Sequence, residues 1–275
     1  LYDNDGAKIA IFDENLKQIG ISNHVAKGEK MYSSRFMGNK AYLVTYKTVD
    51  PLFVIDLSNE TKPTVLGELH IPGYSTYLHP YDENHLIGIG METEEIVNKN
   101  SIGKVTSTTS KITGMKMALF DVSDVNNPTQ LSQTIIGDSR TTSAILTNPK
   151  ALLFSKEKQL LAIPVNNYSE DFEIDSSIDS YSSIVDSYTN YNKSYVSEGY
   201  FVYKININDG FNLKGVITHE TSQKNKNKSS YSYNYNNSKL LRGLYIDNNL
   251  YTISETAIKV NNLDTLELID ELKIK

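Results

Sequence analysis

The stretch Val54-Ile-Asp-Leu-Ser-Asn-Glu-Thr-Lys-Pro63 has a second copy further along the chain, Leu119-Phe-Asp-Val-Ser-Asp-Val-Asn-Asn-Pro128. In both copies, two apolar residues are followed by Asp, an apolar residue, Ser, and a largely polar turn that ends at Pro. Thr and a new apolar stretch then begin in each case. Apolar runs closed by such turns are typical of β-strands, and their recurrence indicates a repeat architecture.

The position after the third strand of each unit recurs along the whole chain. It is occupied by Asp13, Asp56, Asp121, Lys204 and Lys259. Three polar insertions, at residues 92–113, 166–199 and 221–239, widen the spacing between these positions. Without them the repeat returns to about 40–50 residues, the length of a four-stranded propeller blade. We therefore predict an all-β fold, a β-propeller built of four-stranded antiparallel blades in a single domain.

The predicted blades succeed one another along the chain. They cover residues 1–31 as a partial blade, and residues 32–73, 74–142, 143–221 and 238–275 as whole blades. Four blades and a half do not close a ring in an obvious way, and closure is what removes exposed sheet edges. We expect the chain to be the C-terminal part of a larger propeller. The alternative is a ring of five blades that closes imperfectly.

Composition limits the classes of function. The chain of 275 residues has no Cys, which excludes disulfides and thiolate metal sites. Its formal net charge of −6 is modest, so we expect no nucleic-acid partner. No apolar run approaches the about 20 residues that a membrane-spanning helix needs. The first residues form no signal peptide, and we expect no membrane insertion by this chain.

Several stretches resemble one prokaryotic family. They include Asp50-Pro-Leu-Phe-Val-Ile-Asp56 and Ser75-Thr-Tyr-Leu-His-Pro80, and the likeness continues to Leu244-Tyr-Ile-Asp-Asn-Asn-Leu-Tyr-Thr-Ile-Ser254. The family is that of secreted proteins with a C-terminal β-propeller domain distantly related to WD repeats. The resemblance implies a propeller fold and an extracellular or cell-surface location, and it implies no established activity. The chain lacks the N-terminal half found in such proteins, so that half of its own propeller is an expected partner.

The innermost strands carry the candidate ligand-binding residues Arg35, Tyr77 and His79. Inner strands line the channel of a propeller, and Arg offers a planar fork for carboxylates, so these residues suit an anionic or sugar-like ligand. A structural interpretation is favoured over this one. In it, Arg35 pairs with Asp50 or Asp56, and His79 bonds a loop carbonyl, because a fold alone does not supply a function.

Tyrosines are concentrated in the polar insertions. The second insertion and its end contain Tyr181, Tyr188, Tyr191, Tyr195 and Tyr200, and the third contains Tyr231, Tyr233 and Tyr235. The alternation of the last three places their rings on one face of a strand. Binding loops favour Tyr because it supplies rigid contact area, so these rings are candidates for a glycan- or protein-binding surface. The alternative is a hairpin annex whose rings pack on one another.

No catalytic residue and no cofactor are predicted from the motifs. The five His form no pair at zinc-ligand spacing, and no nucleophile elbow is present. Asp171, Glu173 and Asp175 are weak calcium candidates, since their carboxylates suit Ca²⁺ but the Gly and Glu of a calcium loop are missing.

The main hypothesis is a non-catalytic binding module for a protein or polysaccharide at the cell surface. An alternative is a channel-mouth enzyme, either glycan-cleaving or a quinoprotein-like oxidoreductase. That alternative requires Arg35, Tyr77 and His79 to converge in a concave pocket. A second alternative is a structural spacer, which the absence of any pocket or exposed aromatic surface would favour.

Overall fold

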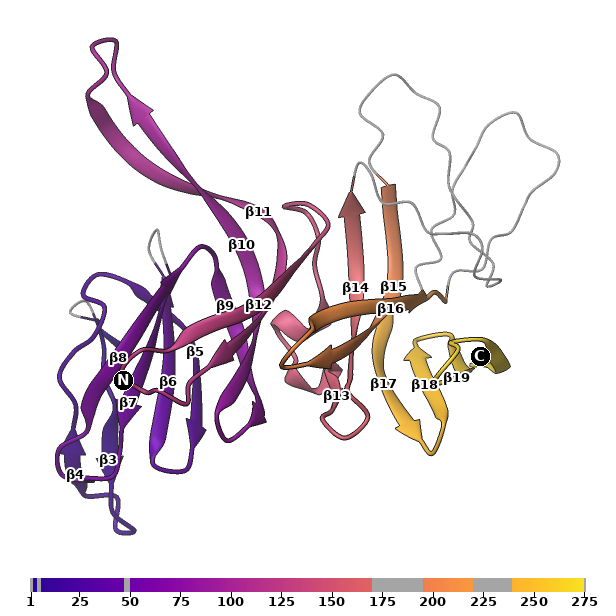
Figure 1. Ribbon diagram of the computed structural model, residues 1–275, viewed down its shortest axis with the longest axis horizontal. Coiled ribbons are helices and arrows are strands. Elements are labelled where there is room, and N and C mark those ends of the chain that lie inside the picture. Colours follow the sequence, from indigo (N-terminus) through magenta and orange to yellow (C-terminus); the bar gives the residue numbers. More distant parts are fainter. Residues whose placement is uncertain (1, 4–5, 47–49, 170–194, 220–238, 275) are drawn as a thin grey trace. The chain divides into compact units, whose positions relative to one another are not determined.

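The computed structural model describes residues 2–3, 6–46, 50–169, 195–219 and 239–274, which are called the described residues below (Figure 1). They form four four-stranded sheets and two short two-stranded sheets. Neighbouring strands run antiparallel within the sheets. The predicted all-β fold of four-stranded antiparallel blades is confirmed.

The chain divides into two compact units, and each is described by itself. Unit 1 comprises Leu1–Ser139 with Ile207–Gly210, and unit 2 comprises Arg140–Asn206 with Phe211–Lys275.

Unit 1 contains the two short sheets and two whole blades. The short sheets are β1 (Tyr2–Asp3) with β2 (Gly6–Ala7) and β3 (Ala10–Phe12) with β4 (Gln18–Ile21). The first blade has β5 (Lys30–Met37), β6 (Lys40–Tyr46), β7 (Asp50–Asp56) and β8 (Thr64–Ile71). The second has β9 (Tyr74–Asp82), β10 (His85–Lys99), β11 (Val105–Asp121) and β12 (Thr129–Ile136).

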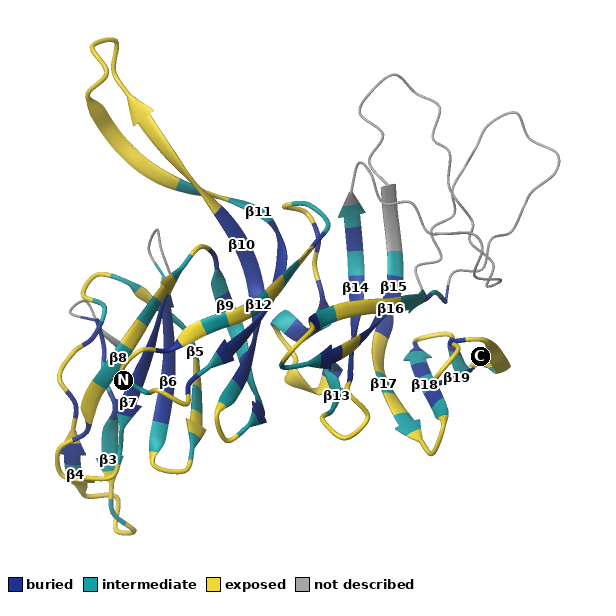
Figure 2. Cartoon of the chain, viewed as in Figure 1, coloured by how far each residue is buried: buried dark blue, intermediate teal, exposed yellow. Residues whose placement is uncertain are grey.

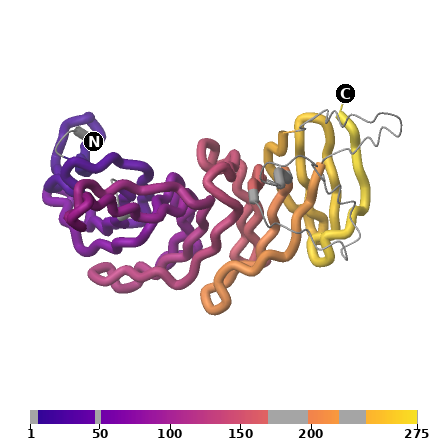
Figure 3. The backbone as a smooth tube through the Cα atoms, turned by 90° about the horizontal axis from the view of Figure 1, so that it is seen from above, coloured from indigo at the N-terminus to yellow at the C-terminus, as the bar shows by residue number. Residues whose placement is uncertain are grey.

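Unit 2 contains two further blades and two short 3₁₀ helices, η1 (Ala144–Leu146) and η2 (Pro149–Ala151). The third blade has β13 (Leu153–Ser155), β14 (Leu160–Ser169), β15 (Tyr195–Asn206) and β16 (Gly210–Ile217). The fourth has β17 (Leu240–Ile246), β18 (Asn249–Ser254), β19 (Ala257–Asn262) and β20 (Leu268–Lys273). Figure 3 shows the strands of this last blade running side by side at the C-terminal end.

The middle strands of the first three blades are buried on both faces, as the dark segments of Figure 2 show, whereas β18 of the fourth blade is buried only at alternate residues. On β6, Tyr42 and Val44 pack with Leu78, Leu86 and Phe120 of the next blade. The alternate residues on β6 face the opposite way, because successive side chains of a strand point to opposite faces. They belong to a second cluster, which contains Ala7, Ile9, Val25, Ala41, Leu43, Phe53 and Ile55.

The repeated Asp and Ser build the turn that follows the third strand. One Asp56 carboxylate oxygen accepts hydrogen bonds from the Ser58 backbone N–H at 2.9 Å and from its hydroxyl at 2.7 Å. The Asp121 carboxylate accepts from the Ser123 N–H at 2.8 Å in the same way. These hydrogen bonds from Ser hold the pKa of both Asp side chains below the ordinary value. The prediction that the two Asp residues form turns is confirmed.

The same turn packs against a glycine on the outer strand of the preceding sheet. A Cβ at Gly20 on β4 would lie 1.9 Å from the Glu60 carbonyl oxygen, and a Cβ at Gly67 on β8 would lie 2.5 Å from that of Val125. Only a residue without a side chain permits this backbone approach. Gly20 and Gly67 therefore let the turns of the first and second blades pack on the sheet that precedes each of them.

The predicted insertion at residues 92–113 continues β10 and β11 as a two-stranded ribbon that projects beyond its blade (Figure 1). Cross-strand pairs such as Glu94 with Lys111 and Val97 with Thr108 maintain the ribbon. The pairing of β10 with β9 ends at Met91, so the ribbon has open edges. It is a surface-exposed, edge-bearing element.

A buried ion pair anchors the base of this ribbon. The Lys116 Nζ lies 3.1 Å from a Glu92 carboxylate oxygen and also donates a hydrogen bond to the Pro72 carbonyl. The backbone N–H of Gly73 donates to the Thr93 hydroxyl at 2.9 Å. These bonds join the ribbon to the turn between β8 and β9. The buried ammonium group of Lys116 requires such partners, because an unpaired buried charge is costly.

His219 is buried in unit 2 and connects the residues after β16 to β18. Its Nδ1 lies 2.9 Å from the Ser254 hydroxyl oxygen, and its Nε2 lies 2.7 Å from the Thr252 hydroxyl oxygen. Burial, and to a smaller extent the charge of Lys259, lower the pKa of His219 to about 4. The ring is therefore neutral in the folded protein at neutral pH.

Replacing Gly67 by Ala should lower the free energy of unfolding by about 1–3 kcal/mol, because the new methyl group meets rigid backbone. Gly215→Ala is the matched control. A Cβ there would lie 2.8 Å from the end of the Leu266 side chain, which can move. Urea denaturation of both variants measures the difference. Gly215 also lies on an outer strand, β16, so equal losses would show that contact with rigid backbone does not set the cost at Gly67.

The buried His219 predicts acid sensitivity. An unfolded His has a pKa of about 6.5, so below that value the unfolded state binds more protons than the folded state. The free energy of unfolding should fall as pH drops from about 6.5 towards 4, by up to about 1.4 kcal/mol per pH unit. In His219→Gln the difference between pH 7 and pH 5 should shrink, whereas exposed His24→Gln should retain it. An unchanged difference in His219→Gln would disprove this linkage.

Candidate functional site

The inner strands β5 and β9 of unit 1 bring the predicted ligand-binding residues into one region. The Ser33 hydroxyl on β5 donates a hydrogen bond to the Ser75 carbonyl on β9 at 2.7 Å, which joins the two strands. Arg35 lies on β5, and Tyr77 and His79 lie on β9. The Tyr77 hydroxyl is 3.0 Å from the His79 Nδ1, so these two side chains are hydrogen-bonded.

Burial and the charge of Arg35 decide the protonation of this pair. Burial lowers the pKa of His79 to about 4, and the Arg35 guanidinium adds to this shift. Burial raises the pKa of Tyr77, and Arg35 acts in the opposite direction there. Both rings are therefore neutral at neutral pH, and Arg35 supplies the positive charge of the group.

The Arg35 side chain keeps an unused hydrogen-bond donor. Its Nε is buried and has no hydrogen-bond partner among the described residues. The Asp56 carboxylate, one of its two predicted partners, accepts hydrogen bonds from Ser58, and Lys40 is the cation that lowers its pKa. Buried donors are nearly always satisfied in folded proteins, so this Nε favours an acceptor supplied by a ligand.

A tyrosine cluster lies where the strands of unit 1 meet the base of the ribbon. It consists of Tyr32 on β5, Tyr46 on β6 and Tyr74 on β9, and we call it the tyrosine cluster. The Tyr74 ring centre lies 4.4 Å from that of Tyr32 and 4.8 Å from that of Tyr46. The Tyr46 hydroxyl donates to the Ser110 hydroxyl on the ribbon, and the Lys30 Nζ lies 5.2 Å from the centre of the Tyr32 ring. All three rings are half-buried.

The predicted tyrosines of the insertions have different outcomes. Tyr231, Tyr233 and Tyr235 lie outside the described residues, as do the calcium candidates Asp171, Glu173 and Asp175. Tyr200 was grouped with the insertion tyrosines, and this is wrong. It is fully buried on β15 and packs in the core between the third and fourth blades. Burial also raises its pKa.

The described residues offer no grouped metal ligands and no membrane-spanning helix. No group of three or more His, Asp or Glu side chains there is placed to hold a metal ion. No helix in this part of the chain is long and apolar enough to cross a membrane.

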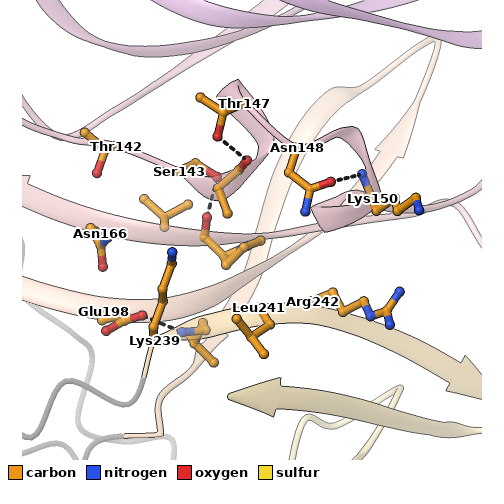
Figure 4. Close-up of a pocket in the computed structure, with 14 residues that line it drawn as sticks. Thr142, Ser143, Thr147, Asn148, Lys150, Asn166, Glu198, Lys239, Leu241 and Arg242 are labelled. Atoms are coloured by element: carbon orange, nitrogen blue, oxygen red, sulfur yellow. Dashed lines mark hydrogen bonds between the residues drawn. The ribbon is translucent and has the colours of Figure 1, made fainter. Parts of the chain in front are cut away.

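Unit 2 contains a pocket of about 590 Å³ (Figure 4). Its walls come from the segment around η1 and η2, from β14 and β15, and from the start of β17. The lining residues are Thr142, Ser143, Ala144, Thr147, Asn148, Lys150, Pro164, Val165, Asn166, Glu198, Lys239, Leu240, Leu241 and Arg242.

Local hydrogen bonds shape this pocket. The Ser143 hydroxyl donates to the Pro164 carbonyl and accepts from the Ile145 N–H at 3.3 Å, which positions η1 against β14. The Asn148 side-chain oxygen accepts from the Lys150 N–H at 3.1 Å and caps η2. A backbone bridge between Thr142 and Asn166 closes one wall. No sequence signal predicted this pocket, because its residues come from segments far apart in the chain.

Comparisons with known proteins agree with the fold. The family described as "Beta propeller domain" matches residues 2–266. An uncharacterised protein of Methanocaldococcus jannaschii is 40% identical over 167 residues, covering 61% of this chain and 24% of that protein. An uncharacterised protein of Archaeoglobus fulgidus is 27% identical over 274 residues, covering 99% of this chain and 32% of that protein. The chain thus spans less than a third of the length of these relatives.

Solved structures that match this chain in the comparison include a hypothetical selenium-binding protein from Sulfolobus tokodaii. It has a TM-score of 0.33 and 8% identity over 99% of this chain and 72% of that one. A β-propeller domain from Myceliophteria thermophila has a TM-score of 0.32 and 9% identity over 99% of this chain and 82% of that one.

The influence of Arg35 on His79 can be measured directly. Replacing Arg35 by Gln removes a positive charge, so the pKa of His79 should rise from about 4. It should stay below about 6.5 because burial, the larger cause, remains. Titration of the His79 ring by NMR gives the value, and Arg242→Gln in unit 2 is the control. A His79 pKa that does not change in Arg35→Gln would show that the two groups do not interact.

Proposed function

Since this chain belongs to the β-propeller domain family, we propose that it is a binding module without catalytic activity. Its target is a protein or polysaccharide of the cell surface, and it acts outside the cytoplasm. The location follows from the resemblance of its repeat stretches to secreted propeller proteins. The observation that carries the proposal is the tyrosine cluster beside the projecting ribbon in unit 1.

The tyrosine cluster has the chemistry of a contact surface. Tyr side chains offer large, rigid and amphipathic area at low entropic cost, and they are enriched where proteins bind one another. Tyr32, Tyr46 and Tyr74 pack on each other and keep part of their surface exposed. The rings are thus pre-organised, which lowers the cost of binding.

The ribbon extends the same region. Beyond Met91 and Met115 its strands pair only with each other, so their outer backbone groups are open. Open edges and exposed apolar residues such as Ile96, Val97 and Val105 favour contact with an extended partner. The hydrogen bond from Tyr46 to Ser110 joins the ribbon to the tyrosine cluster. A large, extended target such as a polypeptide or polysaccharide fits a surface of this kind.

Arg35 adds a polar contact further along the inner strands. Its unsatisfied Nε suits a carboxylate, carbonyl or hydroxyl oxygen of the target. The enzyme hypothesis asks for a concave pocket around Arg35, Tyr77 and His79. The half-exposed aromatic cluster disfavours a simple spacer. The surface therefore supports the binding hypothesis best.

Binding of the chain to the cell-envelope proteins and polysaccharides of its own organism tests this function. Tyr32→Ala should weaken binding about tenfold or more, because it removes one ring of the tyrosine cluster. Phe36→Ala is the matched control, since Phe36 is an aromatic residue of the same strand with 56% of its surface exposed.

Circular dichroism should show that both variants remain folded. Equal binding by Tyr32→Ala and the unchanged chain would remove the tyrosine cluster from the contact surface. Failure of the unchanged chain to bind either fraction would refute the function itself.

A further inference from the structure

We infer that the pocket of unit 2 is a second binding site, and that its ligand is an anionic sugar. Such a ligand joins an acid group, a carboxylate or a phosphate ester, to several hydroxyl groups. The inference rests on the charge, the polar lining and the size of the pocket, and it does not depend on the proposed function of unit 1.

The charged lining has an excess of cations. The charged residues of the lining are three cations, Lys150, Lys239 and Arg242, and one acid, Glu198. Neither Lys150 nor Arg242 forms an ion pair with an acid in the described part of the chain. Figure 4 shows Lys150 and Arg242 together at one side of the pocket, with Glu198 and Lys239 at the other. The side with Lys150 and Arg242 is therefore suited to an oxyanion, for which Arg supplies paired donors.

Glu198 is held against the pocket wall by a backbone hydrogen bond. Its carboxylate oxygen accepts a hydrogen bond from the Leu240 N–H at 2.6 Å, which fixes the side chain between β15 and β17. Burial raises the pKa of Glu198, while the Leu240 N–H and Lys239 act in the opposite direction. A positioned carboxylate of this kind is an acceptor for a hydroxyl group.

Neutral groups complete the lining for a polyhydroxylated ligand. The Thr142 hydroxyl and the Asn148 side-chain NH₂ have no hydrogen-bond partner among the residues that the structure describes. Asn166 lies on the same wall as Thr142. Leu241 adds an apolar surface that is 39% exposed. The volume of about 590 Å³ lies within the about 300–1,000 Å³ of small-molecule sites, enough for a sugar with an acid group.

Calorimetric titration with glucuronate, glucose 6-phosphate, glucose and glucosamine tests the inference. At least one acid sugar should bind, and the first two ligands distinguish a carboxylate from a phosphate site. Glucose should bind about tenfold more weakly or worse, and added salt should weaken acid-sugar binding. Tighter binding of glucosamine than of both acid sugars, or no binding of either acid sugar, would overturn the inference.

Variants place the ligand in the pocket. Arg242→Gln and Lys150→Gln should each weaken acid-sugar binding about fivefold or more, as expected for a lost charged hydrogen bond. Lys273→Gln, an exposed lysine on β20, is the matched control and should bind like the unchanged chain. Tyr32→Ala in unit 1 should also bind like the unchanged chain, so failure of this inference can be told apart from failure of the proposed function. Unaltered affinity in both Arg242→Gln and Lys150→Gln would disprove the site.

Discussion

Burial of both faces of the middle strands in the first three blades is the constraint on which the rest of the structure depends. Tyr42 and Leu43 are neighbours in sequence, yet both are buried and they belong to different core clusters. A sheet with apolar residues on both faces is stable only between two other layers. Neighbouring blades must therefore approach closely, and the outer-strand glycines Gly20 and Gly67 allow the turns of the next blade to do so.

This constraint leaves the strand ends and the insertions as the parts that can vary. In unit 1, the ribbon extends the second blade, and the buried ion pair of Lys116 and Glu92 anchors the base of the ribbon. In unit 2, the pocket lies beside strand ends and the two 3₁₀ helices. Both candidate surfaces thus use a rigid scaffold to hold residues of irregular segments in place.

The sequence predicted well those features that depend on near neighbours. The Asp56 turn closes within two residues, so its pattern was sufficient to assign its structure. Arg35, Tyr77 and His79 were selected from their strand position. Tyr77 and His79 are two residues apart in a regular stretch of β9 and share a face, but the strand pattern does not give the side-chain rotamers that bring the hydroxyl to the ring. Tyr200 was assigned wrongly to the insertion. It lies at the end of a polar insertion, where the local sequence does not distinguish a loop tyrosine from one that begins a buried strand.

The amino-acid sequence by itself determined the repeat, the strand alternation and the turns, since these follow from side-chain direction and local hydrogen bonds. Only the tertiary structure decided which tyrosines gather at the ribbon and which cations line a pocket. Tyr46 meets Ser110, and Glu198 meets Leu240, across long separations in the chain. Contacts of that kind depend on how complete sheets pack, and no local pattern of residues encodes the packing.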